Sequence, residues 1–203
     1  AIVLERSTFD KPLFPTRGSH LVASAMYAYG RDRRTSQQES MMSVGENIDM
    51  IRQWWGVKAH WEQYLGIDAR GVFTVGYAVE GVYTTHPEFD SREATMLSSP
   101  QYAPLIHSRM IYMPEFRADR YLGVGLMPTV RLYDNLYARL SLYAMLRDKF
   151  AGDVMHYMSD LSLIYHTPIG PVSLALTKYN LHNGNNLYLT FNFGYAIFGR
   201  KGL

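Results

Sequence analysis

The sequence contains no cysteine, so neither a disulfide framework nor a thiolate metal site is available. Long hydrophobic runs are also missing: no stretch approaches the roughly 18 apolar residues of a membrane-spanning helix. Neither sign of charge is in large excess, since the formal net charge is +2, and no nucleic-acid partner is expected. The missing apolar run does not exclude a membrane protein, because β-barrel strands alternate in polarity and their mean hydropathy stays near neutral.

What the chain does have is hydrophobic alternation of period two, clearest in its last third. In the final segment the apolar face consists of Leu187, Leu189, Phe191, Phe193, Tyr195 and Ile197. Alternation over this length indicates a strand rather than a helix. The opposite face carries small, hydroxyl and amide side chains instead of the Lys and Glu of a solvent-exposed face. This combination favours the wall of a membrane β-barrel, with lipid outside and a crowded polar lumen inside.

The same alternation divides the chain into a short first segment and eight longer ones. We predict strands at residues 2–7, 20–30, 51–64, 72–84, 121–131, 136–146, 157–167, 172–179 and 187–198. The expected fold class is all-β: a single domain over residues 1–203 that forms an antiparallel up-and-down transmembrane β-barrel of about eight to nine strands. The 16 tyrosines suit the aromatic girdles of such a barrel.

The start of the chain indicates that this barrel is incomplete. The chain begins at Ala1 without an initiator methionine or a signal peptide. A lone short strand and one very long insert also suit a wider wall, whose open edges would be costly in lipid. We expect the chain to be the C-terminal part of a larger barrel, closed by a missing N-terminal part or by a second copy of the chain.

Residues 85–120 are predicted to form that insert and not part of the wall. On composition alone, Leu105–Met113 within them could be a strand. Barrel connections, however, alternate between short turns on one side and longer loops on the other. Counting back from Phe198 at the periplasmic end, a wall strand at 105–113 would place the long polar loop 31–49 on the side of the short turns. We therefore expect a single extracellular insert that folds into the lumen.

Three short motifs, in this order and spacing, resemble a known family. They are FPTRG at residues 14–18, TPIGP at 167–171 and the terminal LTFNFGYAIF at 189–198. The resemblance is to the C-terminal barrel of the BamA/surface-antigen superfamily, and it spans nearly the whole chain. PEFRA at 114–118, followed by YLGVG at 121–125, resembles the branch in which such a barrel follows a patatin-like lipid acyl hydrolase.

The resemblance implies a protein of the outer membrane of a Gram-negative bacterium, with outer-membrane lipid and the barrel assembly machinery as partners. It also implies an assembly signal at the end of the chain, formed by Phe191, Phe193, Gly194, Tyr195 and Phe198. The superfamily's lumen loop carries an Arg-Gly-Phe type motif, of which only Arg117 is matched here. In the patatin-like branch an N-terminal domain supplies the catalytic Ser, in G-x-S-x-G, and an Asp. This chain contains no G-x-S-x-G, so the hydrolase site is not expected in it.

No catalytic, cofactor or metal site is expected within the chain. Its seven histidines show no His-Glu-x-x-His or comparable ligand spacing, and we interpret them as lumen or loop residues. Ser159 and Asp160 lie near His156, but successive strand residues point to opposite faces, which argues against a triad. Arg117 is expected to enter the lumen and to pair with Asp160 or Glu80, because a charge removed from water needs a partner.

Two functions fit these observations. In the first, the chain is an outer-membrane barrel that anchors, assembles or translocates an attached domain, in its sharper version as the C-terminal barrel of a patatin-like phospholipase. In the second, it is a self-contained small barrel that acts as a porin, an adhesin or a lipid-modifying enzyme. A soluble antiparallel β protein is disfavoured, because the leucine stripe at 136–146 and the tryptophans at 51–61 would need complete burial in water.

Overall fold

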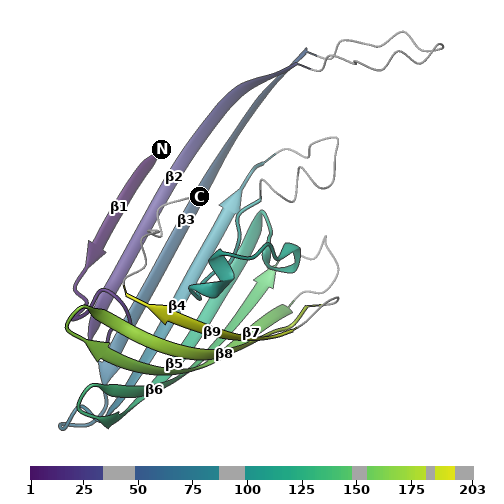
Figure 1. Cartoon of the computed structure of the whole chain (residues 1–203). Coiled ribbons are helices and arrows are strands. Elements are labelled where there is room, and N and C mark those ends of the chain that lie inside the picture. The colour runs from purple at the N-terminus through teal and green to yellow at the C-terminus, as the bar shows by residue number, and fades with distance from the viewer. Residues whose placement is uncertain (34–48, 87–98, 148–154, 182–185, 195–203) are drawn as a thin grey trace.

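The computed structural model of the chain describes residues 1–33, 49–86, 99–147, 155–181 and 186–194. Within them the chain forms one antiparallel sheet of nine strands, which lie in space in the order of the sequence (Figure 1). The strands are β1 (Ile2–Ser7), β2 (Gly18–Arg33), β3 (Asp49–Gly66), β4 (Phe73–Thr84), β5 (Arg120–Tyr133), β6 (Leu136–Arg147), β7 (Met155–Thr167), β8 (Gly170–Tyr179) and β9 (Leu187–Phe193). This confirms the predicted all-β, antiparallel up-and-down architecture. Among the described residues, no helix is long and apolar enough to cross a membrane.

Alternation along each strand sorts the side chains onto two faces of the sheet. On β6, Leu140 and Leu142 are exposed on the outer face, while Ser141 and Tyr143 between and beside them are buried on the inner face. Exposed large hydrophobic side chains occur on all nine strands. Soluble monomers rarely expose an apolar surface of this extent, which suits contact with lipid. Along β3 to β9 the predicted sorting of side chains onto two alternating faces is confirmed.

The inner face holds polar and large side chains together. Glycines make room for some of the large ones: Tyr64 on β3 lies directly opposite Gly76 on β4, and Tyr143 on β6 lies opposite Gly125 on β5. A Cβ atom added at Gly76 would lie 2.4 Å from the Tyr64 ring, and one at Gly125 would lie 2.5 Å from the Tyr143 ring. Each ring therefore lies against the bare backbone of the neighbouring strand, which only glycine allows.

The sheet is curved but open within the described part of the chain. There β1 pairs with β2 and β9 pairs with β8, and these two outermost strands do not pair with each other (Figure 1). Each outermost strand therefore presents one edge whose backbone groups lack a neighbouring strand in the sheet. Such edges are unfavourable in water and far more so in lipid.

The connection between β4 and β5 contributes no wall strand in its described part, residues 99–119. β4 pairs directly with β5, and this part of the connection contains two 3₁₀ turns, η1 (His107–Arg109) and η2 (Pro114–Phe116). We call residues 99–119 the insert. The buried side chains of Tyr102, Met113 and Phe116 belong to the same hydrophobic core as residues from the inner face of the sheet. The insert thus covers part of that face.

The core between the insert and the sheet is rich in methionine and tyrosine. The sheet contributes Met127, Tyr143, Met145, Met158 and Tyr179, all almost completely buried. Phe116 has no exposed surface, and its ring centroid lies 6.3 Å from that of Tyr179 and 5.7 Å from that of His156. Flexible methionine side chains fill irregular gaps of this kind well. The insert therefore packs tightly over β5 to β8.

Candidate functional site

The inner faces of β2, β3 and β4 carry a cluster of ionisable side chains, which the register of the strands brings together. His20 lies directly opposite Glu62, and His60 lies directly opposite Glu80. His60 and Glu62 are two residues apart on β3 and so share its inner face. Directly opposite residues have Cβ atoms about 4.5–5.5 Å apart, so a single run of neighbours joins the three strands.

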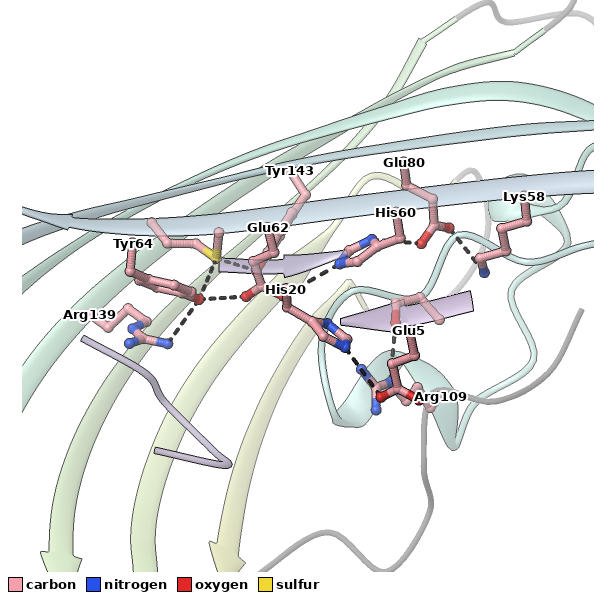
Figure 2. Close-up of polar contacts among 12 residues, drawn as sticks. Glu5, His20, Lys58, His60, Glu62, Tyr64, Glu80, Arg109, Arg139 and Tyr143 are labelled. Carbon is pink, nitrogen blue, oxygen red and sulfur yellow. Dashed lines mark hydrogen bonds and ion pairs between the residues drawn. The ribbon is translucent and has the colours of Figure 1, made fainter. Parts of the chain in front are cut away.

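His60 lies between two carboxylates in this cluster (Figure 2). Its Nδ1 is 3.0 Å from Oε2 of Glu80, and its Nε2 is 3.4 Å from Oε2 of Glu62. Glu80 is also 3.3 Å from Nζ of Lys58 and accepts a hydrogen bond of 2.7 Å from the hydroxyl of Tyr121. Glu62 and Glu80 are both buried, and buried charges persist only with partners of this kind.

Arg139 on β6 extends the cluster toward the other half of the sheet. Its Nε donates to Oγ1 of Thr129 at 2.9 Å, and its guanidinium lies over the Tyr64 ring, 5.1 Å from the centroid. The hydroxyl of Tyr64 in turn donates to Oε1 of Glu62 at 2.7 Å. Arg139 Nη2 also donates to the carbonyl of Pro15 at 2.7 Å, across 124 positions of sequence. The FPTRG segment is therefore held against the inner face of the sheet.

The turn that contains FPTRG, residues 8–17, is organised by its own hydrogen bonds. The carboxylate of Asp10 accepts from the hydroxyl of Thr16 at 2.6 Å and from the backbone N–H groups of Thr16 and Arg17 at 2.9 and 3.0 Å. Partial burial alone would raise the pKa of Asp10, but these hydrogen bonds hold it below its ordinary value. Phe14 takes a positive φ of 51°, and its ring lies 5.4 Å from the Arg139 guanidinium carbon. The turn thus presents Phe14 and Pro15 to Arg139.

A cavity of about 500 Å³ lies between this turn, the insert and the inner faces of the strands. Its charged lining residues are Glu5, Lys11, Glu62, Arg109, Arg139 and Asp160, with His20 beside them. Figure 2 shows the side chains of Glu5 on β1 and Arg109 of the insert pointing toward each other. The cavity therefore combines carboxylates, cations and an imidazole with apolar side chains such as Phe14 and Leu105.

The predicted pairing of Arg117 with Asp160 or Glu80 stays a prediction, because the contacts described for Arg117 are to other groups. Arg117 donates to the carbonyl of Ser99 and to Oε1 of Gln101, both at 2.9 Å, within the insert. Glu80 instead belongs to the group around His60, and Asp160 accepts hydrogen bonds from Ser162 and Thr177. Arg117 also forms a β-bridge with Gln101, which brings acceptors of the insert itself close to its side chain.

The structure describes only part of the predicted assembly signal. Phe191 and Phe193 are exposed on the outer face of β9, as the alternation requires. Gly194 follows with a φ of +80°, and its N–H donates to the carbonyl of Pro171 at 3.0 Å. Tyr195 and Phe198 lie outside the described residues. The role of these residues in assembly remains a prediction.

The sequence interpretation missed the contact between His20, His60 and Glu62. Donor atoms of the three side chains lie within 4.8 Å of one another, and all three residues are buried. The alternation of β3 places His60 and Glu62 on the same inner face, and this feature of the sequence could have indicated that the two side chains lie close together. His20 could not be added to them, because its position opposite Glu62 depends on the β2–β3 register.

Comparison with known proteins finds similarity at the level of the fold. No family model and no curated protein matches the sequence. Among solved structures, the chain is similar to BamA from Haemophilus ducreyi lacking POTRA domains 1–3, with a TM-score of 0.53 and 12% sequence identity. The similarity covers 93% of this chain and 40% of that one, so the chain spans well under half the length of its structural neighbour. The chain thus has a BamA-like β-barrel fold.

Proposed function

We propose that the chain is an outer-membrane β-barrel domain of a Gram-negative bacterium that anchors, assembles or translocates an attached part of the same protein. The observation that carries this proposal is the open nine-stranded sheet, with an apolar outer face and a polar, partly covered inner face. An outer face of this kind is stable in lipid and not in water. Outer-membrane lipid and the barrel assembly machinery are the partners that follow from this location.

Closure of the barrel by further strands of the same protein is the second element of the proposal. The described sheet leaves β1 and β9 with one free edge each, and an unpaired edge in a bilayer costs several kcal/mol for each unsatisfied backbone group. The match covers only 40% of the neighbouring structure, which is compatible with further strands in a longer protein. A second copy of the chain is the alternative source of the missing neighbours.

The finer form of the proposal is that the attached part is a patatin-like lipid acyl hydrolase. Its support is the PEFRA segment of the insert followed by YLGVG, which begins at the second residue of β5. In that case the chain itself is not the enzyme. It holds a hydrolase domain, which carries its own Ser and Asp, at the membrane.

The test is the intact mass and upstream sequence of the native protein, measured by mass spectrometry on outer-membrane fractions. A product heavier by several tens of kilodaltons, about the size of one or more added domains, with G-x-S-x-G upstream of Ala1 supports the patatin form. Small repeated domains upstream would instead support a BamA-like assembly role. A native product that begins at Ala1 would contradict both and leave a small autonomous barrel.

The source of the missing strands is tested separately with engineered cysteines. The chain has none of its own, so Leu4→Cys on β1 combined with Leu189→Cys on β9 introduces one thiol at each free edge. If further strands of the same protein lie between these edges, oxidation of the full-length protein yields neither an internal nor an intermolecular disulfide. A disulfide-linked dimer would show that a second copy closes the barrel.

A further inference from the structure

His20, His60 and Glu62 form the most compact group of metal-binding side chains in the described part of the chain. One donor atom from each lies within 4.8 Å of the other two. Donor atoms about 2.0–2.2 Å from a tetrahedral zinc ion are roughly 3.3 Å apart, so small side-chain rotations would complete the set without movement of the backbone. All three residues are at most 8% exposed, which protects a bound ion from bulk water.

The strands hold these side chains in place before any ion binds. His20 and Glu62 face each other across the β2–β3 ladder, and His60 precedes Glu62 by two residues on the same strand. Both strands lie inside the sheet and are paired on both sides. Sites built on paired strands keep their geometry better than sites on loops.

Each of the three side chains also has a partner on its other polar atom (Figure 2). Nε2 of His20 lies 3.4 Å from Oε1 of Glu5, and Nδ1 of His60 lies 3.0 Å from Oε2 of Glu80. Oε1 of Glu62 accepts the hydroxyl of Tyr64. Carboxylates behind the ligating histidines orient the ring and raise its basicity in metal sites.

We infer that His20, His60 and Glu62 bind one divalent transition-metal ion, for which Zn²⁺ has the matching chemistry. Two imidazoles and one carboxylate, with one position left open, form a donor set that zinc accepts. His20 and Glu62 line the cavity, so the open position faces a space that can hold a water molecule or a small anion. The ion would join β2 to β3 directly, and β1 and β4 through Glu5 and Glu80.

The competing arrangement is an ion cluster without a metal, in which a protonated His60 lies between the carboxylates of Glu62 and Glu80. It makes the same contacts at His60 and leaves His20 beside Glu5. Lys58 favours the metal, because its ammonium group, 3.3 Å from Glu80, already balances the charge of that carboxylate. Glu62, with a carboxylate oxygen within 4.8 Å of a donor nitrogen on each histidine, can supply the negative charge for an ion at the three-residue site.

The experiment is a ZnCl₂ titration of the full-length protein, purified in detergent and freed of metal with a chelator, by calorimetry and by competition with a chromophoric chelator. We expect one zinc ion per chain. Glu62→Gln and His60→Gln should each weaken binding at least a hundredfold. Glu5→Gln, which leaves all three proposed ligands in place, should weaken it 10- to 100-fold.

His166→Gln is the matched control, since His166 is a β7 histidine whose ring lies against Tyr137 and is not one of the three proposed ligands. It should leave the zinc affinity unchanged. Heat-dependent migration in gel electrophoresis reports folding of each variant, and X-ray absorption of the loaded wild type should show nitrogen and oxygen neighbours only. Zinc absent from the folded wild type, or bound equally by folded Glu62→Gln, would overturn the inference. These readouts do not depend on which domain is attached, so the proposed function can fail without affecting them.

Discussion

The two halves of the inner face are filled in different ways. On β2 to β4 the buried side chains include four with acidic or imidazole groups, His20, His60, Glu62 and Glu80, with Lys58 beside them. On β5 to β8 they include many sulfur-containing and aromatic residues, and the insert packs over them. We call these the ionic half and the covered half. The outer faces of both halves carry exposed large hydrophobic side chains.

The difference follows from what each half faces. In the covered half, Phe116 and its neighbours exclude water, and apolar packing stabilises the contact. In the ionic half, carboxylates, cations and tyrosine hydroxyls satisfy one another, and the cavity borders this half as well as parts of β6 and β7. Alternation alone therefore specifies the two faces of the sheet. The residues packed against the inner face determine which side chains are buried there. The predictions below test this division, beginning with the largest expected effect.

Phe116→Ala should damage the covered half most. The side chain has no exposed surface, and its removal leaves a cavity at the centre of the insert. We expect the free energy of unfolding to fall by about 3–5 kcal/mol, measured by urea titration in detergent or lipid vesicles. Met110→Ala, an exposed position of the same insert, should change it by less than about 0.5 kcal/mol. Equal effects of the two variants would mean that the insert does not stabilise the wall.

Glu80→Gln should destabilise the ionic half through charge and not through volume. Glu80 is the shared acceptor of His60, Lys58 and Tyr121, and the amide carries no charge to balance the ammonium group. We expect a loss of about 2–3 kcal/mol, because a buried donor left without its acceptor costs about 1–3 kcal/mol. All three tryptophans lie on β3, so their fluorescence reports on this half. An unchanged midpoint of urea unfolding, followed by this fluorescence, would show that the cluster is solvated and not buried.

Gly125→Ala should act through shape alone. The added methyl group would lie 2.5 Å from the Tyr143 ring and push it off the sheet, at a cost of about 1–3 kcal/mol. Gly81→Ala is the matched control, since a Cβ there meets no atom within 4 Å. It should be neutral or slightly stabilising, because glycine weakens a strand interior. A control as destabilising as Gly125→Ala would exclude the ring contact as the cause.

The smallest expected effect is a loosening of the insert in acid. Burial lowers the pKa of His107, although the negative charge of Asp160 partly opposes this, and Nδ1 of His107 lies 3.0 Å from the Tyr179 hydroxyl. The folded state therefore favours neutral His107. This contribution to stability is complete above the unfolded pKa of about 6.5 and is lost as pH falls below it. Limited proteolysis of the insert should accelerate between pH 7.5 and pH 5 in the wild type and show less pH dependence in His107→Gln.

The wall was predictable from the sequence and the interior contacts were not. Period-two alternation places Leu140 outward and Ser141 inward whatever the rest of the chain does, so the number of strands and their faces follow from it. The strands β2 and β3 proved longer than predicted, at Gly18–Arg33 and Asp49–Gly66, because their ladder continues past the clearest alternation.

Contacts on the inner face depend on which residues lie close in space, and the period-two alternation of the sequence does not give these distances. Arg117 finds its acceptors within the insert, and Arg139 reaches Pro15 across 124 positions. The approach of His20 to Glu62 requires a register that a shift of one residue would abolish. A rule based on ligand spacing along the sequence could not find a group assembled from two strands.

The central claim is that one face of this sheet contacts lipid and the other does not. Because the chain lacks cysteine, single cysteines at 140, 141, 142 and 143 on β6 can each carry a spin label in protein reconstituted into bilayers. We predict high accessibility to oxygen, which partitions into lipid, at 140 and 142, and low accessibility at 141 and 143. Equal accessibility to oxygen at all four positions would contradict the account. So would high accessibility of the labels at 140 and 142 to a water-soluble nickel complex.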